Sequence, residues 1–444
     1  MSGAEAGLQR DPMRGRLDPS AFPSLGPGQL RPGRDVDAID DLLPQAVITP
    51  RESAHVADTI AEARAKKLGI VTSGGATLLH VGALPRRYDI RLSMTAIGDI
   101  VEQNPEDMTV TTQAGVSLSR LQRSLAKAGQ RLAIDVARED RASIGGVVAA
   151  NATGGLRHGF GLPRDLVLGL TAIDGCGRVI RAGGRVVKNV AGYDLVRLLT
   201  GSWGGLAVIT EVTLRTHPLP EAGATLVFEF VSAAELDAAR ARLAGEPMPI
   251  AALDFAIDTT GPTTLWILAV RVEGTEEEVA FQGDRVCAVV GREPADAVED
   301  WESPAHVDDE GGVTLRIGAP ATTLVGVLRD VLARLKEGGG RDLQAGLRVG
   351  GHLGAGVASL HLAAAPSRDD AAVAAGRARV QALLAATAPG GAIRSRVVER
   401  AGAGVKGTCE VWGPAPASIP LMRALKKRLD PDDVLAPGRF TGGL

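Results

Sequence analysis

The sequence holds few cysteines and few aromatic residues, and long apolar runs are missing. The three cysteines, Cys176, Cys287 and Cys409, are far apart. No CxxC pair is therefore available for a zinc ribbon, and no four neighbouring thiolates for an iron–sulfur cluster. So few cysteines, odd in number, are typical of a reducing compartment. No charge-free apolar run reaches the ~18 residues of a membrane-spanning helix. We therefore expect a cytoplasmic protein that contacts a membrane at most peripherally, through a partner.

An excess of charge of one sign is also missing. The formal net charge is −3 over 444 residues, with 49 Lys and Arg against 52 Asp and Glu. This balance gives no electrostatic case for binding nucleic acid or an anionic membrane surface. The length favours about three domains. A hydrophobic content of 45% is normal for a globular chain with a sizeable core.

Glycine, by contrast, is abundant, and many of its 56 copies gather in four loops. Glycine lets a backbone approach another group closely, and exposed amides in such loops form nests for phosphate oxygens. Several loops of this kind predict one extended ligand, such as a dinucleotide, rather than a lone phosphate. The loops are VTSGGAT (71–77), SIGGVVAANATGGLRHG (143–159), GGRVVKNVAGYDL (183–195) and GSWGGLAVITEVTL (201–214).

Two common nucleotide motifs are absent. No segment reads G-x-G-x-x-G between a strand and a helix with an acid about 20 residues later, as a Rossmann site requires. No segment reads GxxxxGK[ST], because the lysine of GGRVVKN is in the wrong register for a P-loop. Any single loop could be no more than a turn in a glycine-rich protein. The four loops in this order favour a binding function.

Strands and helices are mixed rather than strictly alternating, which predicts an α+β fold. Residues 1–36 lack periodicity and predict a disordered arm. The glycine loops belong to a first unit over 37–220, which contains an amphipathic helix at 117–129. A second α+β unit covers 221–405. A C-terminal piece, 406–444, adds a helix and a proline–glycine turn.

The four loops resemble those of the FAD-binding oxidases of the vanillyl-alcohol-oxidase / p-cresol-methylhydroxylase (PCMH-type) superfamily. SGGAT at 73–77 is similar to the family's first pyrophosphate loop, with Ala76 in place of a glycine. SIGGVVAANATGG at 143–155 resembles its second loop, and residues 201–214 resemble its GSxGxLGVITEVTL strand.

A narrower resemblance is to the E subunits of bacterial glycolate oxidases. The segments that carry it are GRVVKNVAGYDL (184–195), VWGPAP (411–416), LMRALKK (421–427) and DPDDVLAPGRF (430–440). The resemblance covers most of residues 40–220 and 405–440.

The resemblance implies a two-part PCMH-type FAD-binding domain over 37–220, a substrate cap over 221–405 and a C-terminal segment that returns to the FAD domain. It implies noncovalent FAD, with hydride passing from the Cα of a 2-hydroxy acid to flavin N5. A sister FAD subunit and an iron–sulfur subunit are the implied partners. Two alternatives stay open: a stand-alone FAD-linked oxidase of another small molecule, and a non-catalytic scaffold.

The resemblance also implies which positions bind FAD, with Arg439 as the cation beside the flavin. His80 does not match the family's position for covalent attachment. The expected cofactor-binding residues are Ser73, Gly74, Gly75, Ala76, Thr77, Ser143, Gly145, Gly146, Asn151, Thr153, Gly154, His158, Gly159, Ile209 and Arg439.

The catalytic residues are harder to assign. Related 2-hydroxy-acid dehydrogenases carry HxGDGNxH, which positions a metal ion or the substrate carboxylate, and the proton acceptor. Here HLGAGVAS occupies 352–359, and His361 falls two places late. Ala355 and Val357 can neither bind a metal ion nor accept a proton, so no metal site is predicted. The weak catalytic candidates are His352, Arg348, Lys188 and Tyr193.

Overall fold

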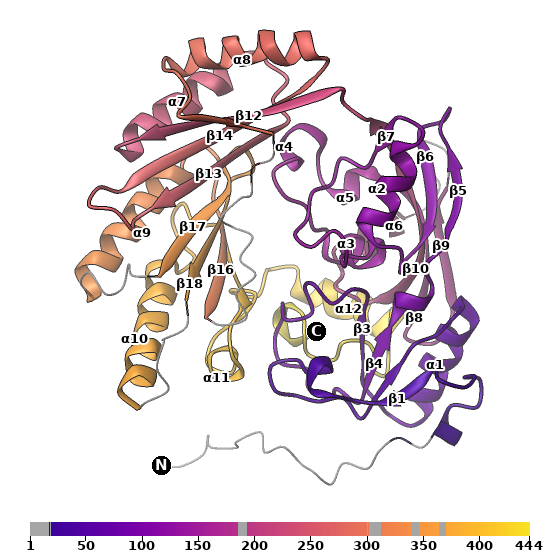
Figure 1. Cartoon of the computed structure of the whole chain (residues 1–444). Coiled ribbons are helices and arrows are strands. Elements are labelled where there is room, and N and C mark those ends of the chain that lie inside the picture. The colour runs from indigo at the N-terminus through magenta and orange to yellow at the C-terminus, as the bar shows by residue number, and fades with distance from the viewer. Residues whose placement is uncertain are drawn as a thin grey trace.

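The chain folds into two units that lie side by side, with the C-terminal segment returning to the first (Figure 1). The computed structural model describes residues 17, 19–184, 193–299, 301, 312–339, 346–363 and 370–444.

The first unit begins with a four-stranded sheet in the order β1–β2–β4–β3, in which the last three strands run parallel. Parallel neighbours need a crossover connection. Helix α1 (Ser53–Ala65) provides one between β2 and β3, and it buries Val56 and Ile60 in the core. The strands are β1 (Leu30–Pro32), β2 (Ala46–Ile48), β3 (Ile70–Ser73) and β4 (Ile90–Ser93), and η3 (Met94–Ala96) follows.

Residues 19–36 belong in part to this folded unit, which corrects the disordered arm expected over 1–36. Phe22 is 1% exposed in the core, and β1 pairs with β2. The prediction failed because one buried ring and a three-residue strand leave no hydrophobic periodicity to detect. The short 3₁₀ turns here are η1 (Pro19–Ala21) and η2 (Asp35–Asp37).

The second sheet of this unit is antiparallel, in the order β5–β6–β10–β8–β9. Helix α2 (Leu118–Ala126) begins where Ser117 accepts a hydrogen bond from the amide of Arg120, and its three leucines are buried. Each buried leucine contributes roughly 1.5–3 kcal/mol to the stability of the fold. The helix expected at 117–129 is confirmed, with its regular part from Leu118 to Ala126. The strands are β5 (Ile100–Asn104), β6 (Thr109–Gln113), β8 (Val167–Asp174), β9 (Val179–Gly183) and β10 (Ala207–Arg215); β7 (Gln130–Arg131) pairs separately with β11 (His217–Pro218).

Four short helices connect these strands. The side chain of Ser143 caps the first of them by accepting from the amide of Gly146, 3.3 Å away. Asn151 ends it in a left-handed conformation with φ 52°. The helices are α3 (Ile144–Ala150), α4 (Arg157–Phe160), α5 (Pro163–Leu166) and α6 (Leu195–Leu199).

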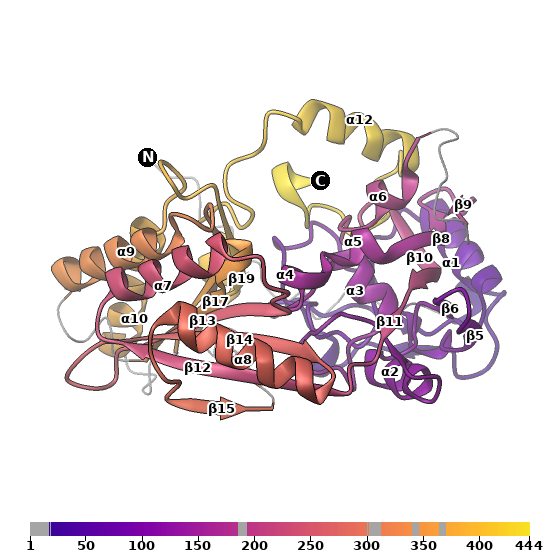
Figure 2. The same cartoon turned by 90° about the horizontal axis from the view of Figure 1, so that it is seen from above.

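The second unit is an eight-stranded antiparallel sheet in the order β15–β12–β14–β13–β17–β18–β16–β19. Helices pack on the face turned away from the first unit (Figures 1 and 2) and enclose a large apolar core with the strands. The strands are β12 (Ala222–Phe230), β13 (Ala252–Asp258), β14 (Leu265–Gly274), β15 (Asp296–Val298), β16 (Val313–Gly318), β17 (Leu347–His352), β18 (Val357–Leu362) and β19 (Ser395–Arg400). The helices are α7 (Ala233–Gly245), α8 (Glu276–Val290), α9 (Leu324–Gly339), α10 (Asp370–Ala386) and the short η5 (Leu353–Ala355).

The C-terminal segment runs back to the first unit through α11 (Ala403–Lys406), α12 (Ile419–Leu429) and η6 (Thr441–Gly443). Lys426 fastens it there, because its buried ammonium group donates to the Gly205 carbonyl (2.8 Å) and to Asp430 (2.6 Å). Asp430 in turn accepts from the amide of Val434. The DPDD sequence that follows α12 is therefore a turn anchored by the buried side chain of Asp430.

These layers confirm the predicted α+β class. None of the helices in the described ranges is both long enough and apolar enough to cross a bilayer.

Candidate active site

A cavity of about 300 Å³ lies between the two units, within the size range of small-molecule sites. Loops of the first unit form one wall, and strands β16 to β19 form the facing wall. The C-terminal segment closes the cavity with Trp412, Arg439 and Phe440.

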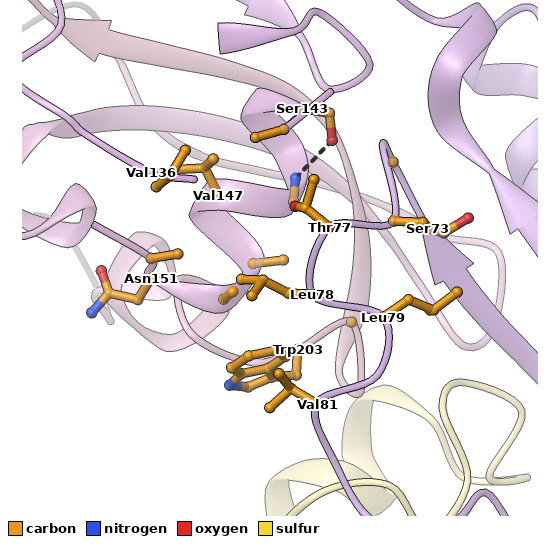
Figure 3. Close-up of a pocket in the computed structure, with 18 of the residues that line it drawn as sticks. Ser73, Thr77, Leu78, Leu79, Val81, Val136, Ser143, Val147, Asn151 and Trp203 are labelled. Atoms are coloured by element: carbon orange, nitrogen blue, oxygen red, sulfur yellow. Dashed lines mark hydrogen bonds between the residues drawn. The ribbon is translucent and has the colours of Figure 1, made fainter. Parts of the chain in front are cut away.

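Residues 73–77 border the cavity directly after β3 (Figure 3). Within the described part of the chain, the backbone amides of residues 74–77 have no hydrogen-bond acceptor. Ala76 holds a left-handed φ of 61°, which costs an L-residue roughly 1–2 kcal/mol. Unpaired amides in a row beside a cavity fit the oxygens of a phosphate group.

The second glycine loop packs tightly against the first. A side chain at Gly74 would collide with the Ser143 hydroxyl, and one at Gly75 with the Arg141 carbonyl. The contact between the two loops therefore requires glycine at these positions, whether or not a ligand also approaches the backbone there. Gly145 is confined in the same way by Ala114.

Arg439 reaches the cavity from the C-terminal segment. Its Nη2 donates to the carbonyls of Leu79 (2.7 Å) and Val81 (2.6 Å). Among the residues that the structure describes, its buried Nη1 finds no partner. Burial lowers the pKa of Arg439, and nearby Asp40 partly offsets this. A buried donor without an acceptor is costly, so an acceptor supplied by a ligand would stabilise this guanidinium.

Three aromatic rings line the cavity beside Arg439. Trp412 packs edge-on against Trp203 and Phe440, with ring centroids 5.3 and 5.1 Å apart. The indole nitrogen of Trp412 donates to the Arg439 carbonyl at 2.7 Å. Figure 3 shows Trp203 beside Val81, at the far end of the chain that leaves Thr77. Such rings offer flat apolar faces to a ring system.

The facing wall carries the polar side chains of the eight-stranded sheet. His352 is 8% exposed, and its Nδ1 lies 2.9 Å from Oδ1 of Asp254. The two residues are opposite each other in the β13–β17 register. Arg316 is paired with Glu399 at 3.0 Å. The lining residues from this sheet are Thr314, Arg316, His352, Val357, Ser359, Glu399 and Arg400.

The cavity is strongly cationic. Of its described lining residues, Glu399 is the single acid, whereas Arg138, Arg157, Arg316, Arg400 and Arg439 are basic. Burial lowers the pKa of His80 to about 3, and Arg400, Lys406 and Arg439 add to the effect. This field favours an anionic ligand.

The structure brings most of the predicted cofactor positions to this cavity. Its lining includes Ser73, Gly74, Gly75, Ala76, Thr77, Ser143, Gly145, Gly146, Asn151, Thr153, Ile209 and Arg439, together with the catalytic candidate His352.

Five predicted residues that the structure describes do not line it, and a sixth lies outside the described residues. The amide of Gly154 is bound to Asp135, and the amide of Gly159 donates to the Ala251 carbonyl. His158 is turned toward Gly354, because α4 packs against the second unit. Arg348 is exposed further along β17, and Tyr193 is 95% exposed. Lys188 lies outside the described residues.

Several site residues escaped sequence reasoning. Asp254 and Asp135 are lone acids in apolar stretches, and Arg316 and Arg400 follow no motif. They reach the site through strand pairing between distant segments, which no local pattern reveals. The one usable signal was that a buried charge in an apolar strand needs a partner.

Family comparisons agree with this architecture. Residues 44–183 match the family described as FAD binding domain, and residues 309–440 match the family described as FAD linked oxidases, C-terminal domain. The chain belongs to the FAD-linked oxidases. The first match contains the glycine loops at 71–77 and 143–159, and the second contains the facing wall of the cavity and Arg439.

Curated relatives of this FAD-linked oxidase match over part of their length. It is 38% identical to the glycolate oxidase subunit GlcE of Escherichia coli, covering 40% of this chain and 49% of that subunit. It is 33% identical to the glycolate oxidase subunit GlcD of Bacillus subtilis, covering 49% and 46%. The mitochondrial D-lactate dehydrogenase (cytochrome) of Arabidopsis thaliana is 32% identical, covering 42% and 33%. The chain thus spans about half or less of the length of these relatives.

A solved structure of alkyldihydroxyacetonephosphate synthase superimposes with a TM-score of 0.68, covering 96% of this chain and 87% of that one. The sequence identity is 14%, so the likeness concerns the fold.

The residues present fit FAD, the cofactor of this family. The unpaired amides of residues 74–77 suit a diphosphate, and the unpartnered Nη1 of Arg439 suits a ligand acceptor. No cluster of three or more metal-binding side chains occurs in the described ranges.

Proposed function

We propose that this FAD-linked oxidase oxidises the CH–OH group of a small 2-hydroxy acid and passes the electrons to a partner subunit. One observation carries the proposal: a single cavity joins unpaired loop amides on one wall to the His352–Asp254 pair and cationic side chains on the other. Residues 73–77, Ser143 and Arg439 would hold FAD noncovalently. When bound, FAD supplies the acceptor for a hydride from the substrate carbon.

Arg316 and Arg400 are the proposed binding groups for the substrate carboxylate. Both line the cavity from adjacent strands, β16 and β19. The ion pair with Glu399 fixes the direction of the Arg316 guanidinium. A planar guanidinium recognises a carboxylate through two parallel hydrogen bonds, which favours hydroxy acids over neutral alcohols.

His352 is the proposed acceptor of the substrate hydroxyl proton. With Asp254 accepting the hydrogen bond of Nδ1, the neutral imidazole carries its lone pair on Nε2. Ala355 and Val357, which replace the acid and the amide of the related motif, have no group that could do this. The first histidine of the motif and an acid from a different strand therefore supply the base.

An external electron acceptor is part of the proposal. Cys287 lies in α8, Cys176 in the turn between β8 and β9, and Cys409 between α11 and α12, and none of the three forms a disulfide. Relatives named as glycolate oxidase subunits support an assembly of several subunits. A sister FAD subunit and an iron–sulfur subunit are the partners that we propose for it.

Anaerobic spectroscopy of the purified full chain tests this function. We expect bound flavin, bleached by glycolate or D-lactate. Bleaching that needs a co-expressed partner would make this chain an accessory subunit, and bleaching by the chain alone would favour a self-sufficient dehydrogenase. A protein that binds no flavin would support the scaffold alternative and contradict the proposal.

A further inference from the structure

A second cavity, of about 260 Å³, lies behind the His352–Asp254 pair. Asp254 lines this second cavity, while its hydrogen-bond partner His352 lines the first. The pair therefore connects two cavities that face different parts of the molecule. Six charged residues line the second one: Arg131, Asp135, Glu139, Asp254, Arg271 and Glu273.

We propose that Asp254 and Asp135 form an outlet through which the substrate's hydroxyl proton passes from His352 to water in the second cavity. The inference rests on the function proposed above, because it assigns the fate of the proton that this function releases. Nothing in the first cavity provides the same outlet: its single described acid, Glu399, is held by Arg316.

The two carboxyl groups flank one short turn. A side chain at Gly155 would begin 2.5 Å from Oδ2 of Asp254, and one at Gly154 would begin 2.6 Å from Oδ2 of Asp135. Consecutive glycines thus let both acids approach the same stretch of backbone. Thr153 and Arg157 beside this turn line the first cavity, whereas Leu156 and both acids line the second, so the turn borders both cavities.

Asp135 is firmly positioned. Its Oδ1 accepts from the Thr153 hydroxyl (3.1 Å) and the Gly154 amide (2.9 Å), and its Oδ2 accepts from the Leu156 amide (3.1 Å). Burial raises the pKa of Asp135, and the charge of Asp254 raises it further. A carboxyl group with a raised pKa can hold a proton in transit, whereas an ordinary aspartate releases it at once.

The proton balance is simple. The substrate loses a hydride from carbon to the cofactor and a proton from its hydroxyl, so the C–O bond becomes a carbonyl. The O–H bond breaks as an N–H bond forms at Nε2 of His352. The proton on Nδ1 then moves to Asp254, and from there through Asp135 or directly to water. This leaves neutral His352 with its proton on Nε2, so a reorientation of the imidazole ring has to bring that N–H to Asp254 and the unprotonated nitrogen to the substrate side before the next turnover.

The surroundings suit water and a moving proton. A cavity lined by charged groups holds ordered water. Glu273 pairs with both Arg131 and Arg271, so these cations are largely compensated. The other charged or titratable groups near the route are Glu139 on the second cavity and Arg157 and His158 on α4, which interact electrostatically with Asp135 and Asp254 respectively.

Two variants test the outlet from different sides. Asp135→Asn removes the second acid. Ala269→Leu fills the second cavity opposite Asp254, with which Ala269 pairs in the strand register. It leaves both aspartates of the route in place. In single-turnover experiments with a pH-indicator dye, we expect proton release to lag behind flavin bleaching by about tenfold or more in both variants. In the unaltered protein the two should keep pace.

Matched controls separate the outlet from general damage. Asp258→Asn changes an acid on the same strand outside both cavities, and Ala382→Leu enlarges a partly buried residue of α10. Both should behave like the unaltered protein. Proton release that keeps pace with bleaching in Asp135→Asn and Ala269→Leu would overturn the outlet and leave the proposed function intact. If no hydroxy acid bleaches the flavin of the unaltered protein, the proposed function itself fails.

An infrared pH titration needs no substrate. The resting holoprotein should show a carboxylic-acid band whose midpoint lies above that of an ordinary aspartate, and Asp135→Asn should lose it. Absence of this band from the unaltered protein would contradict the role of Asp135 whatever the substrate proves to be.

Discussion

His352 at the end of β17 and Asp254 on β13 share a hydrogen bond of 2.9 Å although 98 residues separate them in sequence. The pairing of the two strands places them directly opposite each other. A buried acid that accepts from one ring nitrogen fixes the tautomer and orientation of a histidine. This relationship supports His352, rather than the exposed Arg348 or Tyr193, as the proton acceptor.

His352→Gln should therefore slow substrate-driven flavin reduction by about 10²–10⁴-fold, the usual contribution of a general base. Flavin binding should stay unchanged, because the histidine belongs to the opposite wall. Stopped-flow absorbance under anaerobic conditions measures the rate. A His352→Gln protein that reduces its flavin as fast as the unaltered one would show that the base lies elsewhere.

Arg316→Ala should raise the KM for a hydroxy acid about 10- to 100-fold, since a hydrogen bond to a charged group contributes ~1.5–3 kcal/mol. Arg348→Ala is the matched control, because Arg348 belongs to the same sheet but lies outside the cavity. Steady-state kinetics with an artificial electron acceptor distinguish the two. Equal effects of both substitutions would argue against a carboxylate site at Arg316.

Arg439→Lys should weaken FAD binding by about tenfold or more. Lysine keeps the charge but cannot hold both carbonyls, Leu79 and Val81, and still present a second nitrogen to a ligand. Fluorescence of released flavin reports the affinity. Arg423→Lys is the control, because Arg423 also donates to a carbonyl, that of Gly442, on the exposed surface. Undiminished affinity in Arg439→Lys would limit Arg439 to a structural role.

Ala76→Gly should stabilise the protein by about 0.5–1 kcal/mol. Relief of the left-handed strain gains ~1–2 kcal/mol, and the greater freedom of the unfolded chain takes back ~0.4–1 kcal/mol. Ala415→Gly, at an exposed loop position without a positive φ, should show the loss alone. Thermal or denaturant unfolding measures the stability of both variants. A destabilised Ala76→Gly protein would contradict the claim that Ala76 is strained.

His80 should make folding stability depend on pH between about 6.5 and 3. Its pKa falls from 6.5 to about 3 on folding. Between these two pH values His80 is therefore protonated in the unfolded chain and neutral in the folded chain. Stability is full above pH 6.5 and declines as the pH falls, at up to about 1.4 kcal/mol per pH unit. His80→Gln should flatten this slope in denaturant unfolding of the apoprotein. An unchanged slope would mean that His80 is better solvated than its surroundings suggest.

Local sequence patterns predicted the parts of the site that are local in the chain. Ser143, the loop at 73–77 and Arg439 were expected at one site from the order of the motifs and the family resemblance that they carry, and all of them line the cavity. The facing wall could not be found this way, since Arg316, Arg400 and Asp254 meet only through strand register across the second unit. His158 was expected at the cofactor site, but α4 packs against η5 of the second unit and carries His158 with it. This contact joins distant segments of the chain, so no local sequence pattern indicates it.

The central claim is that FAD and a small anionic substrate share the cavity between the two units. A structure determined with FAD and a 2-hydroxy acid tests it most directly. The account predicts the diphosphate against residues 73–77 and the substrate carboxylate beside Arg316, with its hydroxyl facing His352. FAD bound on another surface, or a substrate bound away from His352, would contradict it.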